Sequence, residues 1–482
     1  MADLAARGTT VRRLQIRCRT VDRVTAQARA GQFLEEATAH PPSLPPGAIL
    51  CIRRLSDPRP GVVSFDARRG APAQWTQAVK SAIDERVRAS ARPARGDVPA
   101  DAEAVMFADR AEMLACLAAD WCTSTLGRRW WWYALLGQAA DDDAVLKAWL
   151  TAPHHIAAAL EEAARLRVAA RFVGRIDRNT VRALLRVLIV EHNLDRLVAP
   201  IERMMVGVLP GVAQQLPADR LSPSDAPGPW SRCVPECATS MLRADQRCLL
   251  GVALTLRRQP WRVRTIEFAA QVEGWSSDVL RSAEAKEREP RRAVVEPATA
   301  PAPPMLPVGL PGGEELPPNT HIAMVTSRLG GVFYLLNVAI ALGLYGDFTT
   351  PRARGINLPI WDFVRLAGWH LAPRRFRRDP LWQLVAHLAG RDARGWQRDP
   401  LWVTQSLVPH LRSRIARALG VAHLRDAGAV LCVHRAQVVT SPAHLDVFFS
   451  LAAHPMAIRL AGLDRDPGWI PAADRTVTFH YD

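Results

Sequence analysis

The sequence predicts an α+β protein that is predominantly α-helical, and three observations lead to this fold class. Hydrophobic residues make up 49% and charged residues 23% of the 482-residue chain, which is the composition of a folded globular protein. Over most of the chain, apolar residues recur at steps of three and four, as on the buried face of a helix. Near both ends, short apolar runs lie between turn residues, as in strands.

The first hundred residues predict a small α/β unit. Strands are expected over Val11–Cys18 and Gly47–Leu55, with a helical pattern between them that ends at the breaker run PPSLPPG. A second helix is expected over Ala71–Ala91, where apolar residues have helical spacing. Together these elements form one compact unit at the N-terminus.

A helical region follows this unit. Ala104–Cys122 predicts a short strand that enters a helix, with Asp109 as the N-cap and Glu112 three residues later in a capping box. Apolar spacing then predicts further helices over Asp143–Leu150, Ile156–Arg171, Thr180–Asn193 and Arg247–Leu256. We assign residues 1–280 to N-terminal α/β and helical domains, because 482 residues exceed what a single core supports.

Residues 281–318 are interpreted as an interdomain linker. Nine of the 29 residues from Pro290 to Pro318 are proline, and this density excludes a helix or a central strand. Because proline-rich chains are semi-extended, the linker is expected to hold two domains apart.

Residues 319–482 predict a C-terminal helical bundle with a small antiparallel sheet. Helices are expected over His321–Tyr345, Leu358–Leu371, Asp379–Gly390 and Asp399–Gly420. The period then changes to short apolar runs between SP, HP and DPG turns. These runs predict strands over Gly428–Val439, His444–Leu451, Met456–Leu463 and Asp474–Asp482.

The segment Leu329–Tyr345 has 17 residues without a charge, slightly fewer than the roughly 20 that span a bilayer. Asn337 lies in its middle and Gly330 and Gly331 near its start, and no second span accompanies it. We therefore predict a helix buried in its own domain or in a protein interface, with no stable membrane insertion. A membrane helix is the alternative.

The tetrapeptide DPLW occurs twice, at Asp379 and at Asp399. Aspartate at an N-cap accepts hydrogen bonds from free helical N–H groups, and proline at the first helical position loses no bond. Both motifs are therefore interpreted as helix starts rather than as catalytic aspartates. Asp464 and Asp466, beside a DPG sequence, are interpreted as turn residues rather than as a carboxylate pair.

Arginine and tryptophan cluster in one short segment, which predicts a partner contact. The aromatic area beside cations suits a protein interface, and it could also stack on nucleic-acid bases or bind a carbohydrate. Consecutive helical residues point in different directions, so at least one tryptophan is expected in the core. The residues of this candidate contact are Arg128, Arg129, Trp130, Trp131 and Trp132.

No motif in the sequence predicts a metal, a cofactor or a catalytic residue. Cys233 and Cys237, with Cys248 nearby, have a spacing that zinc could use, but they lack a second close pair and a neighbouring histidine. Phosphate-binding loops, nucleophile elbows, metalloprotease motifs and dinucleotide fingerprints are absent from the sequence. The chain is therefore expected to bind partners rather than to catalyse a reaction.

The chain is basic, with 62 Lys and Arg against 47 Asp and Glu and a formal net charge of +15. This charge favours anionic partners, so a nucleic-acid-binding protein with exposed aromatics is the alternative function. The N-terminus has no apolar signal region and the eight cysteines are scattered. We therefore expect reduced thiols and a cytoplasmic location.

Several strings together resemble an uncharacterised protein family encoded in gene clusters for extracellular contractile injection systems, which are phage-tail-like particles. The strings are VMFADRAEMLACLAADWC, RRWWW, LGGVFYLLNVAIALGLYGDF and RLAGLDRDPGW. This resemblance implies a cytoplasmic, particle-associated accessory or assembly protein whose partners are particle components such as baseplate, sheath or ATPase. It implies no catalytic residues.

Overall fold

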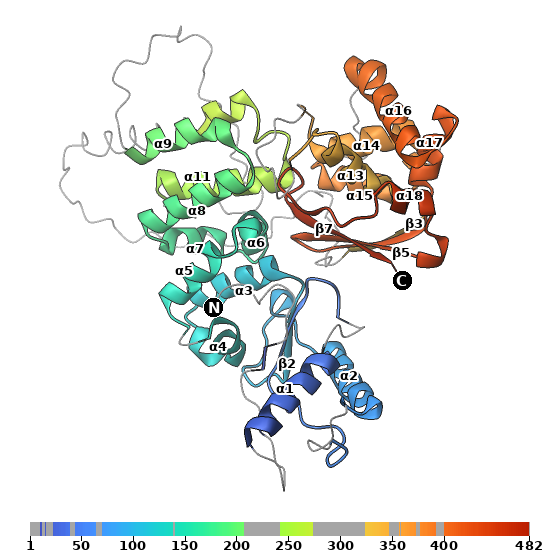
Figure 1. Ribbon diagram of the computed structural model, residues 1–482. Coiled ribbons are helices and arrows are strands. Elements are labelled where there is room, and N and C mark those ends of the chain that lie inside the picture. The colour runs from blue at the N-terminus through green and yellow to red at the C-terminus, as the bar shows by residue number, and fades with distance from the viewer. Residues whose placement is uncertain are drawn as a thin grey trace, which may run out of the picture.

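The computed structural model has an α+β fold dominated by helices, as the sequence predicts (Figure 1). An N-terminal α/β unit lies at the bottom of Figure 1, a helical region at its upper left and the C-terminal region at its upper right. The described residues are 10, 11, 15, 23–38, 44–63, 70–137, 140–206, 242–272, 323–346, 356, 358–372, 376–391 and 400–481.

Two helices and a two-stranded sheet form the N-terminal unit. Its elements are α1 (Arg23–Thr38), β1 (Ile49–Ile52), α2 (Ala73–Arg88) and β2 (Ala104–Phe107). The strands are antiparallel, and the two helices pack through Phe33 and Trp75. The strand predicted over Val11–Cys18 falls largely outside the described residues.

The helical region is built around α3, which packs against α6. Its helices are α3 (Arg110–Cys122), α4 (Trp130–Leu136), α5 (Asp142–Leu150), α6 (Ile156–Arg165), α7 (Ala169–Arg175), α8 (Arg178–Glu191), α9 (Val198–Val206) and α11 (Ala244–Arg258). The N-cap prediction is confirmed, because the Asp109 side chain accepts a hydrogen bond from the Glu112 N–H. The single helix predicted over Ile156–Arg171 is wrong: the backbone turns at Arg167, whose φ is +58°.

The C-terminal region stacks helices on a five-stranded sheet. The helices are α13 (Tyr334–Ala341), α14 (Ile360–Leu371), α15 (Pro380–Leu388), α16 (Val408–Leu419), α17 (Leu424–Cys432) and α18 (Met456–Leu460), with a π-helical segment over Val403–Leu407. The strands are β3 (Ala323–Ser327), β4 (Ala436–Thr440), β5 (His444–Phe449), β6 (Gly468–Ile470) and β7 (Arg475–Tyr481). Their order is β3-β4-β5-β7-β6, and β5 and β7 are parallel, so the sheet is mixed rather than antiparallel.

Three predicted elements of the C-terminal region have the wrong type. The start of the predicted helix His321–Tyr345 is strand β3, which pairs with the distant β4. The first half of the predicted strand Gly428–Val439 belongs to helix α17, and the predicted strand Met456–Leu463 begins with helix α18. In each case tertiary context overrides a short local pattern.

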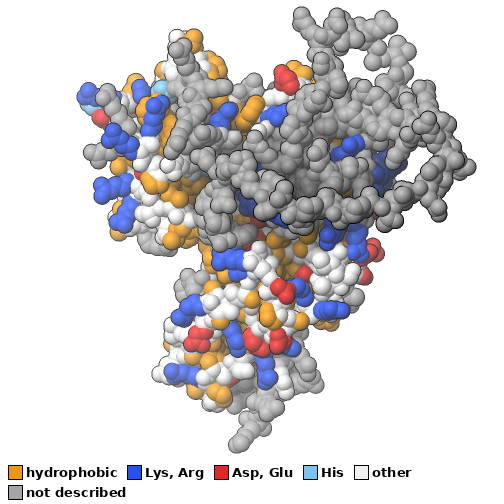
Figure 2. Space-filling model, turned by 180° about the vertical axis from the view of Figure 1, so that it is seen from behind, with side chains coloured by type: hydrophobic (Ala, Val, Ile, Leu, Met, Phe, Trp, Pro, Cys, Tyr) orange, Lys and Arg blue, Asp and Glu red, His pale blue; other side chains and the backbone are white. Residues whose placement is uncertain are grey.

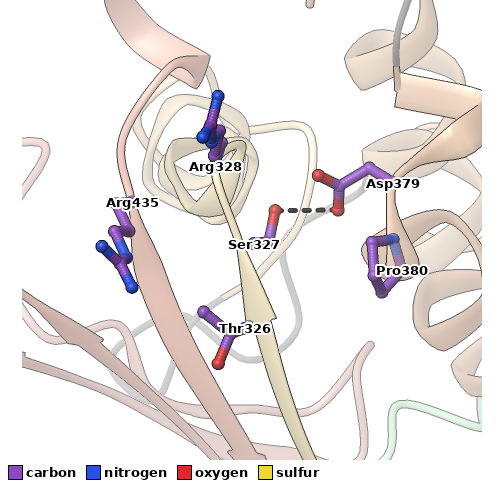
Figure 3. A pocket seen from close by; sticks show the side chains of 6 residues that line it. All are labelled: Thr326, Ser327, Arg328, Asp379, Pro380 and Arg435. Carbon is purple, nitrogen blue, oxygen red and sulfur yellow. Dashed lines mark hydrogen bonds between the residues drawn. The ribbon is translucent and has the colours of Figure 1, made fainter.

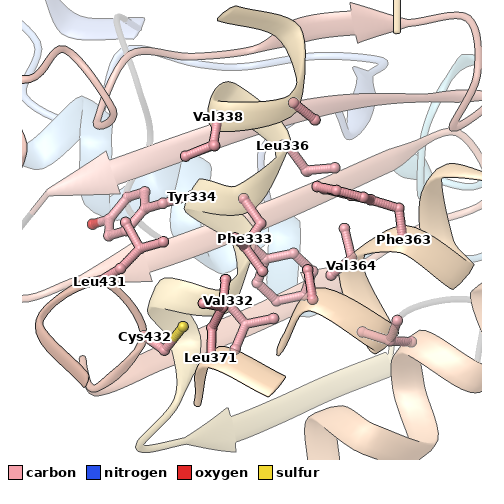
Figure 4. Close-up of a cluster of buried hydrophobic side chains, with 14 of the residues drawn as sticks. Val332, Phe333, Tyr334, Leu336, Val338, Phe363, Val364, Leu371, Leu431 and Cys432 are labelled. Carbon is pink, nitrogen blue, oxygen red and sulfur yellow. The ribbon is translucent and has the colours of Figure 1, made fainter. Parts of the chain in front are cut away.

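The segment Leu329–Tyr345 is buried in the C-terminal core, as predicted (Figure 4). It forms a short 3₁₀ turn over Gly330–Phe333 and the eight-residue helix α13. The Asn337 side-chain amide donates hydrogen bonds to two backbone carbonyls, those of Leu463 and Arg465. Among the helices that are described, none combines the length and the apolarity needed to cross a bilayer.

Glycine is required where this segment passes α17. A Cβ atom added to Gly330 would lie 2.2 Å from the Cβ of Ala436, and one added to Gly331 would lie 2.1 Å from the Leu431 carbonyl oxygen. Because neither glycine has a side chain, the Gly330–Gly331 backbone can lie directly against the end of α17 and the start of β4. This close packing helps to place the start of β4 beside the end of β3.

Candidate functional site

The candidate site lies at one end of the five-stranded sheet, where three neighbouring strands begin or end. Ser327 at the end of β3 pairs with Ala436 at the start of β4, and Ala436 pairs with Phe449 at the end of β5. Two pockets open here, and Arg435 lines both of them. We therefore treat them as one surface and call it the sheet-end site.

The larger pocket has a cavity volume of about 360 Å³ and lies between β3, β4 and the start of α15 (Figure 3). The Asp379 carboxylate on its wall accepts hydrogen bonds from the Ser327 hydroxyl at 2.8 Å and from the Leu381 N–H at 2.9 Å. The DPLW motif is thus confirmed as a helix start at Asp379, whereas Asp399 lies outside the described residues. Asp379 has a structural role at this wall of the pocket. The pocket is lined by Thr326, Ser327, Arg328, Asp379, Pro380 and Arg435.

Two arginines of this pocket lie just outside the β3–β4 ladder. Arg328 directly follows Ser327 at the end of β3, and Arg435 directly precedes Ala436 at the start of β4. Both side chains are exposed, and within the described part of the chain neither forms an ion pair. The site therefore carries two arginines next to a cavity whose lining also includes Asp379.

The smaller pocket, of about 90 Å³, lies on the other side of Arg435. Burial lowers the pKa of His434, and a ring nitrogen of this residue lies 2.7 Å from the Val430 carbonyl oxygen. The lowered pKa favours the neutral form of the His434 ring, which adds no charge beside Arg435. Its lining is Val433, His434, Arg435, Phe449, Ser450, Ala453 and His454.

Exposed apolar side chains continue from the smaller pocket. Val433 is 46% exposed at the end of α17, and Leu451 is 52% exposed in the 3₁₀ turn Leu451–Ala453 that follows β5. On α18, Met456 is 64% and Leu460 is 82% exposed. Val433 itself lines the smaller pocket, and Leu451 and Met456 lie within two residues of lining residues in the sequence. A group of exposed apolar side chains is typical of a partner-binding site.

Positive charge dominates the neighbouring surface of α16 and α17. From residue 319 to residue 482 the sequence has 19 arginines and no lysine, against 11 aspartates and no glutamate. Arg414, Arg417 and Arg425 are exposed and form no ion pair with any residue that is described. Figure 2 shows the resulting Lys and Arg side chains at the upper left edge of the molecule.

The predicted arginine–tryptophan contact is largely part of the N-terminal core. Trp131 and Trp132 are fully buried, and the Trp132 indole N–H donates to the Asp120 carboxylate at 2.6 Å. Arg129 also pairs with Asp120, at 3.2 Å. Both buried rings are needed to fill the core around α3, so the prediction of a partner contact is wrong for these two tryptophans. Among the five predicted residues, Arg128 is the exposed one.

A second polar cluster joins the helical region to the C-terminal sheet. Arg257 of α11 donates to the Glu161 carboxylate at 3.0 Å, to the Asp474 carboxylate at 2.6 Å and to the Pro442 carbonyl at 2.6 Å. The side chain of Arg257 is 5% exposed. The two regions are therefore in direct contact, which corrects the expectation that the linker holds them apart.

Asp109 strengthens this junction. Besides capping α3, its carboxylate accepts hydrogen bonds from the Ser441 hydroxyl at 2.6 Å and from the Ala443 N–H at 2.7 Å. Burial would raise the pKa of Asp109, but His444 and these hydrogen bonds lower it overall. The carboxylate is therefore ionised and engaged at neutral pH, and we interpret the junction as structural rather than catalytic.

The remaining candidate residues have structural roles or cannot be placed. Asp466 accepts a hydrogen bond from the Phe479 N–H at 2.7 Å, and Asp464 lies in a turn, as predicted. Cys233 and Cys237 lie outside the described residues. Within the described ranges, no group of His, Cys, Asp and Glu side chains is arranged to hold a metal ion.

Comparison with protein-family models, with curated proteins and with solved structures finds no match to this chain. The class of protein must therefore be argued from the sheet-end site itself. This site was not predicted from the sequence, because Arg328 and Arg435 are distant in sequence and only the β3–β4 register brings the neighbouring strand ends together. The assignment of residues 323–327 to a helix concealed that register.

Proposed function

We propose that this chain is a non-catalytic accessory or assembly component of a contractile, phage-tail-like injection particle and that it acts through protein–protein contacts. The main support for a binding role is the set of exposed apolar side chains at and after the smaller pocket, together with the arginines of the sheet-end site. The apolar residues are Val433, Leu451, Met456 and Leu460. The particle context rests on the resemblance of its sequence strings to that family.

The composition of this surface favours a protein partner. Binding surfaces are enriched in Arg, Met and aromatic residues and bury an apolar centre inside a polar rim. Val433, Leu451 and Met456 would supply the apolar centre, while Arg328 and Arg435 would belong to the rim. Partners in this proposal are particle components such as the baseplate, sheath or ATPase.

Co-sedimentation with purified particles tests this proposal. The full chain should sediment with particles, and the triple substitution Leu451→Ser, Met456→Ser and Leu460→Ser should reduce the bound fraction at least tenfold, since each buried side chain contributes about 1 kcal/mol or more. A matched control removes three exposed apolar side chains elsewhere, through Val24→Ser, Val190→Ser and Ile266→Ser. Equal binding by both triple variants, or no sedimentation of the unsubstituted chain, would contradict the proposal.

Nucleic-acid binding is the second candidate function, and the exposed arginines of α16 and α17 favour it. Arg414, Arg417 and Arg425 could contact phosphates, whose binding weakens steeply with salt. In a mobility-shift assay at low salt, Arg414→Gln, Arg417→Gln and Arg425→Gln together should then abolish a shift seen with the unsubstituted chain. No shift for the unsubstituted chain at low salt rules this function out.

A further inference from the structure

We propose that the sheet-end site binds a short extended segment of an acidic partner protein, with a carboxylate in the larger pocket and an apolar side chain in the smaller one. This inference rests on the proposed protein-binding function and specifies the chemistry of its partner. It assigns Arg328 and Arg435 as the carboxylate-binding residues and Val433, Phe449 and Ala453 as the apolar contacts.

The arrangement of the two arginines carries the argument for a carboxylate. Arg328 and Arg435 both line the larger pocket, so an anion bound in this pocket would lie close to two guanidinium groups. Guanidinium binds carboxylate through paired N–H donors. Within the described residues neither arginine forms an ion pair, so both are available to an incoming carboxylate.

The charge of the pocket favours a single carboxylate over a phosphate chain. Two arginines and one aspartate line the pocket, which leaves one net positive charge if all three are ionised. The Asp379 carboxylate is fixed at the wall by Ser327 and by the start of α15. A closely spaced series of phosphates would meet this fixed negative charge, whereas one side-chain carboxylate need only contact the arginines.

The smaller pocket indicates which second side chain of the bound peptide should lie near the carboxylate. It adjoins the larger pocket at Arg435 and is walled by Val433, Phe449 and Ala453. Its volume of about 90 Å³ suits a side chain of modest size. Since successive residues of an extended peptide advance by about 3.3 Å, an acidic residue and an apolar residue a few positions apart would occupy both pockets.

A peptide selection on the full chain tests this inference without assuming a partner. We expect a random dodecapeptide phage library, selected on the immobilised chain, to enrich peptides with Asp or Glu within four residues of an apolar residue. In fluorescence polarisation, the enriched peptide should lose roughly tenfold to a hundredfold in affinity when its acid is replaced by the corresponding amide.

Substitutions in the chain identify the pocket. Arg435→Glu and Arg328→Glu should each lower peptide affinity by at least tenfold, whereas Arg417→Glu, which changes an exposed arginine of α16, should change it less than twofold. Thermal unfolding of all three variants checks the fold. If Arg435→Glu unfolds at the same temperature as the unsubstituted chain, its loss of affinity cannot be ascribed to a weakened sheet.

Three outcomes overturn the inference: no enriched peptide, enriched peptides without acids, or equal affinity for Arg435→Glu and Arg417→Glu. Particle co-sedimentation of the same variants separates this inference from the proposed function. If the unsubstituted chain and Arg435→Glu sediment equally with particles, the chain does associate with particles, but not through the carboxylate pocket. If the unsubstituted chain does not sediment, the proposed function falls, and the peptide affinities still decide the pocket.

Discussion

Replacing Arg257 by methionine should weaken the folded state by about 3–5 kcal/mol. The Arg257 guanidinium is buried between Glu161 and Asp474 and also donates to the Pro442 carbonyl. Methionine preserves much of the volume but leaves Asp474, whose side chain is 4% exposed, without this cation. Removal of one partner from a buried ion pair typically costs this amount, because the other charge remains buried.

The pKa of Glu161 gives a second measure of how much these ion pairs stabilise the folded state. Burial alone would raise this pKa, but Arg257, Arg165 and Arg258 lower it from 4.5 to about 2. A pKa lowered by this amount on folding adds roughly 3 kcal/mol to the free energy of unfolding at neutral pH. Because the folded pKa is the lower one, this stability is fully present above about pH 4.5 and is lost as pH falls towards 2.

Urea unfolding followed by tryptophan fluorescence measures the effect. At pH 7 the free energy of unfolding of Arg257→Met should be lower by about 3–5 kcal/mol, and the difference from the unsubstituted chain should shrink as pH falls from 4.5 towards 2. Arg417→Met, at an exposed position of α16, should change the stability by less than about 0.5 kcal/mol. If Arg257→Met costs no more than Arg417→Met, our account of the junction is wrong.

Three further substitutions test other parts of the structure. Gly331→Ala should cost about 1–3 kcal/mol in thermal unfolding, since its Cβ would clash with the Leu431 carbonyl oxygen, whereas Gly127→Ala has open space; equal effects would contradict this packing. Burial lowers the pKa of His192 from 6.5 to about 4, so stability is full above pH 6.5 and falls by up to roughly 3 kcal/mol towards pH 4. His192→Asn should reduce this pH dependence in urea unfolding, and an unchanged profile would exclude the ring as its source. Arg435→Glu should change the free energy of unfolding by less than about 0.5 kcal/mol, because Arg435 is exposed and forms no ion pair with a described residue; a clearly lower unfolding temperature would show that its side chain supports the sheet.

The fold class followed from local signals that tertiary contacts did not override. Asp109, Asp379 and Asp177 each cap a helix, and the first two were recognisable from aspartate followed by a helical apolar pattern. Strand β3 could not be recognised in this way, because its five residues precede an apolar run that has helical spacing. Its pairing with β4 is a long-range contact, and no local pattern encodes such a contact.

The candidate site was less predictable than the fold. Arg128 to Trp132 were predicted as a partner contact because of their aromatic density, but aromatic area serves a core as well as an interface. Trp131 and Trp132 are buried around α3, and no property of the sequence distinguished the two uses. The arginines of the sheet-end site had no distinctive neighbours in sequence, because their significance arises from the cross-strand register.

Strand β4 connects the two polar features of the C-terminal region. It begins at Ala436 beside the sheet-end site and ends at Thr440, next to the Ser441–Ala443 turn that binds Asp109. Its five residues span about 17 Å, so the junction holds one end of the strand and leaves the other available to a partner. Since β4 pairs with a neighbour on each side, it is a rigid support. A partner bound at Arg328 and Arg435 would therefore be held in a fixed orientation relative to the N-terminal helices, which the proposed assembly role requires.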